Sequence, residues 1–339
     1  MFKKAQTDIY PTDFAVSIKN ATKTFTQWQR DNTGKGLIKN LIKPEKKTIT
    51  ALDDVTFSIR KGEFVAYAGP NGAGKSTTMK LLSGMLLPTS GDISVLSLSP
   101  QKQRTALMKR LGILFGNRTE LWWDHPIIQS FEWKKVVWGI SDEMYNKNLK
   151  MVVELLEIGN PLKTFARELS LGQRMRADLA MMLLHSPEVI LLDEPTLGLD
   201  VVAKRQMIDF LKQINKENGV TIIVTSHDMD DLEEMAERIL MISSGKLAFD
   251  DSFTKLRSIT GNLTRVSVTM EMGFMPYIEN SKLLSSNNGI FEYDVDLTKT
   301  PVRDLLSQLS TNQGVLDVEI RKAPIEQVIA GLYRNWNAS

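Results

Sequence analysis

The sequence contains no cysteine, which excludes disulfide bonds and thiolate-ligated metal sites. It also contains no run of 18 apolar residues, and the start Met1-Phe2-Lys3-Lys4 is not followed by an apolar stretch. We therefore expect neither a transmembrane helix nor a signal peptide, and the lack of cysteine agrees with a cytosolic chain. A net charge of only +2 gives no support to nucleic-acid binding.

The rest of the composition is that of an ordinary globular protein. The 339 residues are 42% hydrophobic and 24% charged, which favours about two domains with a sizeable core. The charge is uneven, because residues 1–50 carry ten lysines and arginines against four acidic residues. This basic segment indicates either an acidic surface nearby, such as lipid headgroups, or a solvated loop.

A glycine-rich stretch between an apolar run and a helical run organises the sequence. It fits the pattern G-x-x-x-x-G-K-[ST] and comprises Gly69, Pro70, Asn71, Gly72, Ala73, Gly74, Lys75, Ser76 and Thr77. Such a loop between a strand and a helix points several backbone N–H groups and the positive end of the helix dipole at one spot. We expect Lys75 to reach the β- and γ-phosphates of a nucleoside triphosphate and Ser76 to bind Mg²⁺.

The pattern of apolar residues predicts an α/β fold with a mainly parallel sheet, followed by a small α+β domain. The predicted strands of the first part are Phe14–Phe25, Thr48–Ile59, Glu63–Ala68, Val189–Leu192 and Thr221–Val224, and its predicted helices are Ile127–Trp138, Asp142–Glu157 and about Leu171–Leu184. In the second part we expect strands at Thr264–Met270, Phe291–Leu297 and Val315–Ile320, helices at Val302–Leu309 and Pro324–Tyr333, and a loop at Ser281–Gly289.

Two carboxylates, Asp193 and Glu194, directly follow the apolar strand Val189–Leu192. The carboxyl ends of parallel strands are where an α/β sheet presents its ligands. We expect Asp193 to hold Mg²⁺, directly or through water, and Glu194 to face the γ-phosphate and polarise the attacking water. The alternative is an acidic pair at the surface with no role in a site. The phosphate loop upstream argues against this alternative.

A second helix start lies at Leu169–Gln173, where Ser170 is well placed as the N-cap. A serine and a glycine at a helix N-terminus can bind an anion. The residues Ser170, Leu171, Gly172 and Gln173 would then contact a nucleotide held by a second copy of the chain in a two-fold dimer. A simple capping box accounts for the same spacing equally well.

Together these motifs resemble those of ABC transporter ATPases over about residues 14–255. The matching segments are the Walker A motif at Gly69–Thr77, the signature at Leu169–Gln173, the Walker B motif at Val189–Asp193, the D-loop at Leu197–Asp200 with its Asp200, and the switch-histidine segment at Thr225–Asp228. The resemblance implies a P-loop NTPase fold, with a RecA-like core plus antiparallel β and helical subdomains, that binds ATP and Mg²⁺. It also implies that His227 contacts the γ-phosphate, whereas His125 and His185 are expected to be structural.

Finer features are similar to the subgroup that energises ABC-2-type exporters, such as drug and polysaccharide efflux ATPases. The segment Phe115–Asp124 resembles the Q-loop of this subgroup, with Asn117 at the position of the metal-contacting glutamine. Asparagine is one methylene shorter, so a bridging water can replace direct contact with Mg²⁺. Leu171 stands where the signature commonly has glycine. The aromatic ring that stacks on adenine falls at Phe25, three residues from Trp28.

The expected organisation is a tail at 1–13, a nucleotide-binding domain at 14–258 and an accessory domain at 259–339. The nucleotide-binding domain would contain a helical subdomain at about 117–186 and a basic insertion at 27–50. Part of this insertion has the spacing of a short amphipathic helix, which is short for binding a membrane independently.

We interpret the chain as the ATP-hydrolysing subunit of an ABC-2-type exporter. It would form a homodimer around two ATP and act on separate permease subunits, at the cytoplasmic face of the cell membrane and without nucleic acid. One alternative is a soluble ABC-type ATPase that acts on nucleic acid or ribosomes, although such proteins usually carry two cassettes or a coiled-coil insertion. Another is a regulatory ATP binder with little hydrolysis, which Glu194 and His227 argue against.

Overall fold

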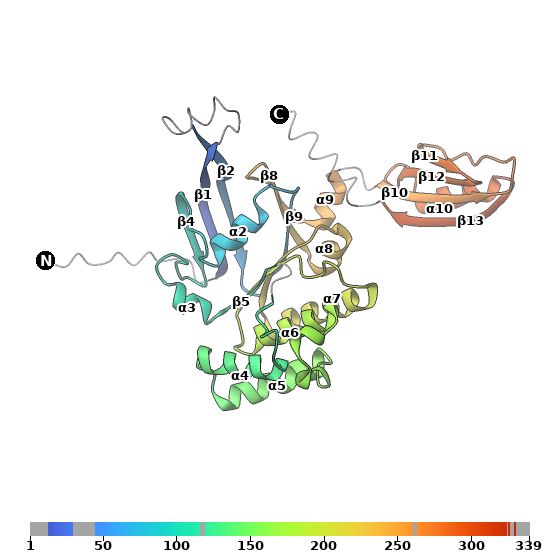
Figure 1. The fold of residues 1–339 in the computed structure, drawn as a ribbon. Helices are drawn as coiled ribbons and strands as arrows, with labels where there is room; N and C mark the ends of the chain where they lie inside the picture. Colours follow the sequence, from blue (N-terminus) through green and yellow to red (C-terminus); the bar gives the residue numbers. More distant parts are fainter. Residues whose placement is uncertain are drawn as a thin grey trace, which may run out of the picture. The chain divides into compact units, whose positions relative to one another are not determined.

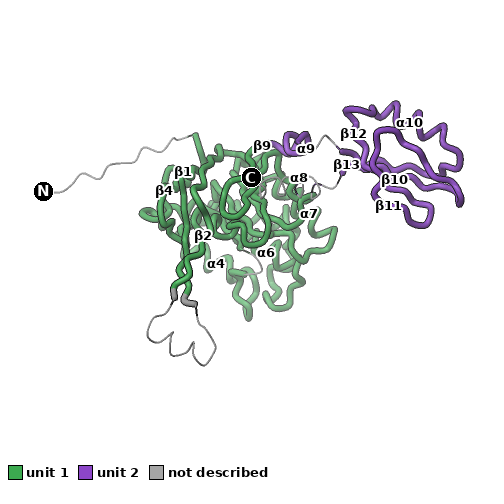
Figure 2. The backbone as a smooth tube through the Cα atoms, turned by 90° about the horizontal axis from the view of Figure 1, so that it is seen from above, with its two compact units in different colours: residues 1–250 green, residues 251–339 purple. Residues whose placement is uncertain are grey.

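The computed structural model describes residues 13–29, 45–115, 119–259 and 263–323, together with Ile325 and Ile329. The chain divides into two compact units, residues 1–250 and 251–339 (Figure 1, Figure 2). The division falls before helix α9 (Phe253–Ile259), whereas the sequence placed the domain boundary after residue 258. Most of the predicted tail, residues 30–44 of the basic insertion, Asn117 and most of the last predicted helix lie outside the described residues.

A six-stranded sheet forms the centre of the first unit, in the order β5-β6-β7-β3-β8-β9. Every pairing from β5 to β8 is parallel, which confirms the predicted α/β fold. Strands β3 and β7 are buried along their whole length, as expected for strands covered on both faces. The bounds are β3 Phe64–Ala68, β5 Leu111–Phe115, β6 Val189–Asp193, β7 Thr221–Thr225, β8 Arg238–Ser243 and β9 Lys246–Ser252.

A second, antiparallel sheet of three strands has the order β2-β1-β4. Its strands are β1 (Phe14–Gln29), β2 (Glu45–Arg60) and β4 (Ser90–Val95). The first two extend further than the sequence predicted and run side by side as a long ribbon (Figure 1). Helix α2 (Lys75–Leu82) joins the two sheets, because its buried Met79 and Leu82 belong to one hydrophobic cluster with residues of both.

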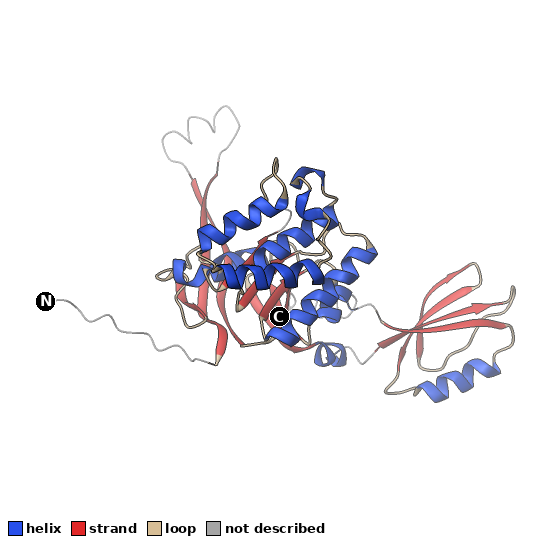
Figure 3. Ribbon diagram, turned by 90° about the horizontal axis from the view of Figure 1, so that it is seen from below, coloured by secondary structure: helices blue, strands red, loops and turns tan. Residues whose placement is uncertain are grey.

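The three helices that the sequence predicts between residues 127 and 184 are confirmed, with ends that differ by at most two residues. They are α4 (Ile127–Trp138), α5 (Asp142–Leu155) and α6 (Leu171–Leu183), and Figure 3 shows the helices of the first unit in blue beside its red strands. The other α-helices in the described part of this unit are α3 (Arg104–Met108), α7 (Val201–Asn218) and α8 (Met229–Met235). Within the described ranges, no helix has the length and apolar character needed to span a bilayer.

The second unit contains a four-stranded antiparallel sheet in the order β11-β12-β10-β13 and helix α10 (Val302–Thr311). Leu305 and Leu309 of the helix share a hydrophobic cluster with alternate residues of β10 and β12. The prediction of a loop at Ser281–Gly289 is wrong, because most of this segment is strand β11 (Ser281–Asn287), which pairs with β12 as an edge strand. The other strands are β10 (Leu263–Met270), β12 (Ile290–Asp296) and β13 (Val315–Lys322).

Candidate nucleotide site

The phosphate loop connects the end of β3 to the start of α2, and its glycines are required by its shape. Gly74 has a φ of 116°, in the left-handed region that favours glycine. A Cβ atom on Gly74 would lie 2.6 Å from the carbonyl oxygen of Ala51, and one on Gly69 would lie 2.3 Å from that of Ile242. The loop is therefore packed tightly between the backbones of β2 and β8, with no room for side chains at these two positions.

Lys75 is the first residue of α2 and its side chain folds back under the loop. Its Nζ donates hydrogen bonds to the carbonyl oxygens of Gly69 (2.6 Å) and Pro70 (3.3 Å). Burial lowers the pKa of Lys75, and the negative charges of Glu194 and Asp193 oppose that shift. The ammonium group therefore lies within electrostatic reach of both carboxylates predicted to act in the site.

Asp193 ends strand β6, and Glu194 follows with a φ of 59°. This left-handed conformation is uncommon for a residue with a side chain and turns the chain sharply at the strand end. The Glu194 N–H donates to Thr225, the last residue of the neighbouring strand β7, at both the carbonyl oxygen (3.1 Å) and Oγ1 (3.1 Å). The turn is thus fixed by contacts with the adjacent strand.

The imidazole of His227 reaches the carboxylate of Glu194. Its Nε2 lies 2.7 Å from Glu194 Oε1, and the His227 side chain is about half exposed. The two residues follow neighbouring parallel strands, which explains why they meet at the carboxyl edge of the sheet. The segment after His227 is held by Lys204 of α7, whose Nζ lies 2.8 Å from Asp228 and 3.0 Å from the buried Asp231.

Ser76 and Asp193 line the same cavity, of about 450 Å³. Among the described residues, no cluster of three or more His, Cys, Asp or Glu side chains is placed to hold a metal by itself. Mg²⁺ does not require such a cage, because it is commonly bound by one or two protein oxygens, phosphate oxygens and waters. A hydroxyl and a carboxylate facing one cavity beside a phosphate loop fit Mg²⁺ bound together with a nucleotide. Asn117, the third predicted metal contact, lies outside the described residues.

Two charged residues that the sequence did not single out, Glu120 and Lys134, also line this cavity. Lys134 of α4 is almost fully buried, and its Nζ lies 3.2 Å from Glu120 and 4.8 Å from the ring centroid of Trp138. Asp178 of α6 accepts hydrogen bonds from Thr119 Oγ1 (2.8 Å) and from the Glu120 N–H (3.2 Å). These contacts tie the chain just beyond β5 to two helices.

Two buried groups of this region should give opposite pH dependences of stability. Burial raises the pKa of Asp178 to about 6, and burial together with the Lys134 charge lowers the pKa of His185 to about 4. On acidification from pH 7 to 5, folded Asp178 takes up a proton before the unfolded form does, which adds stability. Unfolded His185 takes up a proton before the folded form does, which removes stability.

We expect each contribution to amount to about 1 to 2 kcal/mol over this interval, so that they largely cancel in the wild type. Relative to wild type, His185→Gln should gain stability between pH 7 and 5, and Asp178→Asn should lose it. Urea unfolding at pH 7 and pH 5 gives the change in the free energy of unfolding for each variant and for wild type. A loss of stability that is the same at both pH values, such as that from a lost hydrogen bond, cancels in this comparison. Changes of the same sign in the two variants would contradict the prediction.

Ser170 is the N-cap of α6 and forms a complete capping box with Gln173. The Ser170 Oγ accepts from the Gln173 N–H (3.2 Å), and the Gln173 side chain accepts from the Ser170 N–H (2.9 Å). This helix start lies against the D-loop of the same chain, because a Cβ on Gly198 would be 3.0 Å from Leu171 Cδ2. Asp200 caps α7 by accepting from the Ala203 N–H at 2.8 Å.

Phe25 lies on β1, paired with Ile49 of β2, and is partly buried. The Nζ of Lys23 lies 5.1 Å from the centroid of its ring. The ring can therefore stack on a base only through the face that Lys23 leaves open. The side chain of Trp28, the competing aromatic, is outside the described part of the chain.

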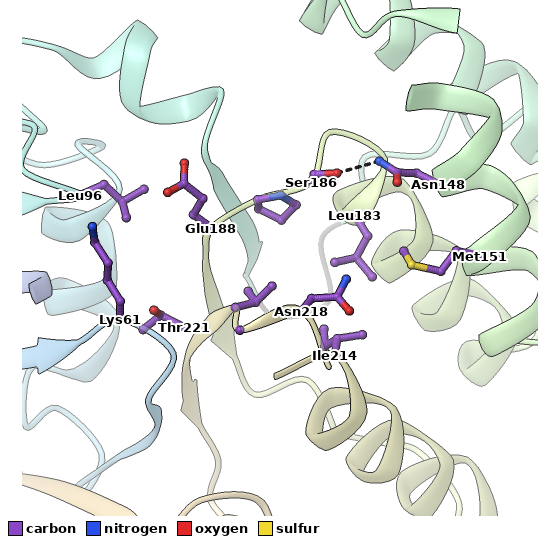
Figure 4. A pocket seen from close by; sticks show the side chains of 13 residues that line it. Lys61, Leu96, Asn148, Met151, Leu183, Ser186, Glu188, Ile214, Asn218 and Thr221 are labelled. Atoms are coloured by element: carbon purple, nitrogen blue, oxygen red, sulfur yellow. Dashed lines mark hydrogen bonds between the residues drawn. The ribbon is translucent and has the colours of Figure 1, made fainter. Parts of the chain in front are cut away.

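A second cavity, of about 380 Å³, lies at the opposite edge of the sheet, where β6 and β7 begin (Figure 4). Its lining includes Glu188 and Thr221, and Asn148 donates to Ser186 at 2.8 Å. The Glu188 carboxylate is paired with Arg110, whose Nη2 donates to Glu188 Oε2 at 2.8 Å. This cavity is away from the phosphate loop and presents no comparable set of phosphate-binding groups.

Comparisons with known proteins are consistent with this geometry. A family model described as ABC transporter matches residues 52–197. The chain is 33% identical over 268 residues to the "Uncharacterized ABC transporter ATP-binding protein YhcH" of Bacillus subtilis, which covers 78% of this chain and 84% of the relative. It is also 33% identical over 232 residues to the "Probable multidrug ABC transporter ATP-binding protein YbhF" of Escherichia coli, which covers 68% of this chain but only 39% of that protein.

Among solved structures, the fold is similar to the ATP-binding cassette MJ0796 in a dimeric, post-hydrolysis state bound to ADP and Pi. The TM-score is 0.58 at 25% sequence identity, and the match covers 70% of this chain and 98% of that chain. The match leaves about 30% of this chain without a counterpart in that structure.

Proposed function

Because this chain belongs to the ABC transporter ATP-binding proteins, we propose that it is the ATP-hydrolysing subunit of an ABC-2-type exporter. Family membership makes the chain an ATPase whose hydrolysis is coupled to transport. The name of the Escherichia coli relative, a probable multidrug transporter subunit, supports the efflux subgroup. The subunit would act at the cytoplasmic face of the membrane, bound to separate permease subunits.

The observation that carries the proposed chemistry is the 2.7 Å contact between His227 and Glu194, beside a lysine held under the phosphate loop. Lys75 and the loop N–H groups bind the phosphates, and the oxygens of Ser76 and Asp193 bind Mg²⁺. When bound there, Mg²⁺ would supply positive charge that offsets the negative charge of the phosphates. The Glu194 carboxylate accepts a hydrogen bond from the attacking water and orients it towards the γ-phosphate.

His227 has two partners in this proposal. Its Nε2 lies 2.7 Å from Glu194 Oε1. With ATP bound, the same N–H can donate to a γ-phosphate oxygen, which frees Glu194 for the water. The contact therefore holds the imidazole next to the carboxylate that orients the attacking water.

The second half of each site is proposed to come from another copy of the chain. Ser170 is exposed at the start of α6, and its helix N-terminus is suited to bind a phosphate. The dimeric state of the similar cassette bound to ADP and Pi supports this arrangement. Two copies would close around two ATP and reopen after hydrolysis, and this motion would drive the permease.

Fractionation of cells that express the tagged chain tests the transport role against the alternative role on ribosomes or nucleic acid. We expect the chain to sediment with membranes and, after detergent extraction, to co-purify with an integral membrane protein. High salt or nuclease treatment should not release it from the membrane fraction. Recovery with ribosomes or DNA, and never with membranes, would contradict the exporter proposal.

A further inference from the structure

Thr225, the last residue of β7, contacts both predicted carboxylates, although the nucleotide-site motifs assign it no role. It is completely buried. Its Oγ1 donates to Asp193 Oδ1 at 2.6 Å and accepts from the Glu194 N–H at 3.1 Å. The side chain therefore connects the end of β7 to Asp193, the last residue of the neighbouring strand β6, and to Glu194, which follows it.

The direction of these hydrogen bonds is determined by chemistry. A threonine hydroxyl has a single proton, and the backbone N–H of Glu194 is itself a donor, so the hydroxyl proton must go to the Asp193 carboxylate. A hydroxyl-to-carboxylate distance of 2.6 Å is typical of a charge-assisted hydrogen bond. The contact thus fixes the rotation of the carboxylate that shares a cavity with Ser76.

We propose that Thr225 is a positioning residue for Mg²⁺-dependent ATP hydrolysis. Its hydroxyl orients the Asp193 carboxylate towards the metal, and its hydroxyl and carbonyl together hold the left-handed turn at Glu194. This inference rests on the proposed role of Asp193 as a metal contact. Removal of a hydrogen-bond partner of a ligating carboxylate typically weakens metal binding by about 10- to 100-fold.

The test compares Thr225→Val, which keeps the shape and the carbonyl but removes the hydroxyl, with Thr225→Ser, which keeps the hydroxyl. Thr221→Val is the matched control, because Thr221 begins the same strand, is equally buried and accepts from the Gly62 N–H at 2.9 Å at the far edge of the sheet. Thr225→Cys, which retains a weak donor of similar size, serves if the valine variant does not fold.

Metal affinity is measured as Mn²⁺ binding by electron paramagnetic resonance with a non-hydrolysable ATP analogue, alongside the Mg²⁺ dependence of turnover. We expect Thr225→Val to weaken Mn²⁺ binding by about 10- to 100-fold, with Thr225→Ser close to wild type and Thr225→Cys intermediate. Nucleotide binding without metal should remain unchanged in all of them. The control Thr221→Val should bind Mn²⁺ normally, whatever its stability.

A further variant, Asp193→Asn, tests the proposed metal role of Asp193 separately from the positioning role of Thr225. If Asp193→Asn weakens Mn²⁺ binding and Thr225→Val does not, the positioning role of Thr225 is wrong and the metal role of Asp193 stands. If neither variant changes Mn²⁺ affinity, both are wrong. Equal weakening by Thr225→Val and Thr221→Val would also overturn the inference, because it would reflect a general defect of strand β7.

Discussion

Glu194→Gln should reduce ATP turnover by about 10²- to 10⁴-fold while leaving ATP binding intact. Glutamine has nearly the same shape as glutamate but carries no negative charge, so it cannot accept a proton from water or orient it as strongly. The contact with His227 and the turn held by Thr225 involve atoms that glutamine can retain. The expected product is a dimer that keeps ATP bound, because closure does not require hydrolysis.

The measurements are steady-state ATPase activity, nucleotide retained after gel filtration and the molar mass of the eluted species. Glu188→Gln is the matched control, because Glu188 immediately precedes β6 where Glu194 immediately follows it. Glu188→Gln removes an ion pair with Arg110 at the edge of the sheet away from the phosphate loop. This control should hydrolyse ATP normally, so its ATP-bound dimer should not persist. Wild-type turnover in Glu194→Gln would remove this residue from the mechanism.

Ser170→Asp should strongly reduce hydrolysis without destabilising the fold. Aspartate caps helices as well as serine does and favours the positive end of the helix dipole. If Ser170 faces the γ-phosphate of ATP held by a second copy, the new carboxylate opposes a like charge at the cost of several kcal/mol. We expect turnover and ATP-induced dimerisation to fall on the order of 100-fold or more.

This substitution distinguishes the two interpretations of the capping box. If Ser170 only caps α6, aspartate should leave activity unchanged. Ser141→Asp provides the control, since Ser141 is the N-cap of α5 and accepts from the Met144 N–H at 3.2 Å in the same way. Thermal unfolding should be similar for both variants, while only Ser170→Asp loses activity. An active Ser170→Asp enzyme would contradict the shared site.

The elements that the sequence predicted well are those encoded by neighbouring residues. The phosphate loop, the strand ending at Asp193 and the capping box at Ser170 each follow from a short spacing of residue types. The predicted loop at Ser281–Gly289 failed because serine- and asparagine-rich residues can still pair as an edge strand when a partner such as β12 is available. This partner is close in the chain, because Asn287 pairs with Ile290 across the two-residue turn Asn288-Gly289, where both residues have a positive φ. An Asn-Gly pair between two runs of strand length is the local signal that could have predicted this hairpin.

Parts of the candidate site depend on long-range information instead. Thr225 contacts Asp193 and Glu194 only because β6 and β7 are neighbours in register, with Asp193 opposite Thr225. Lys134 is ordinary in an amphipathic helix pattern, and only the fold shows that it is buried beside Glu120. The signal available in the sequence was a lysine on the inward side of α4, between the apolar positions Phe131 and Trp138.

The strand order has a consequence for the biosynthesis of the chain. The phosphate loop leaves β3, which lies between β7 and β8, and the loop packs against the backbone of Ile242 in β8. During translation the loop therefore has its neighbour β2 early but lacks its neighbour β8 until about 240 residues have been made, and the pairings of β3 with β7 and β8 are both long-range. ATP can stabilise the nascent chain only after β8 has joined the sheet. Until then the first unit is incompletely folded, cannot be stabilised by its own ligand, and is exposed to chaperones and proteases.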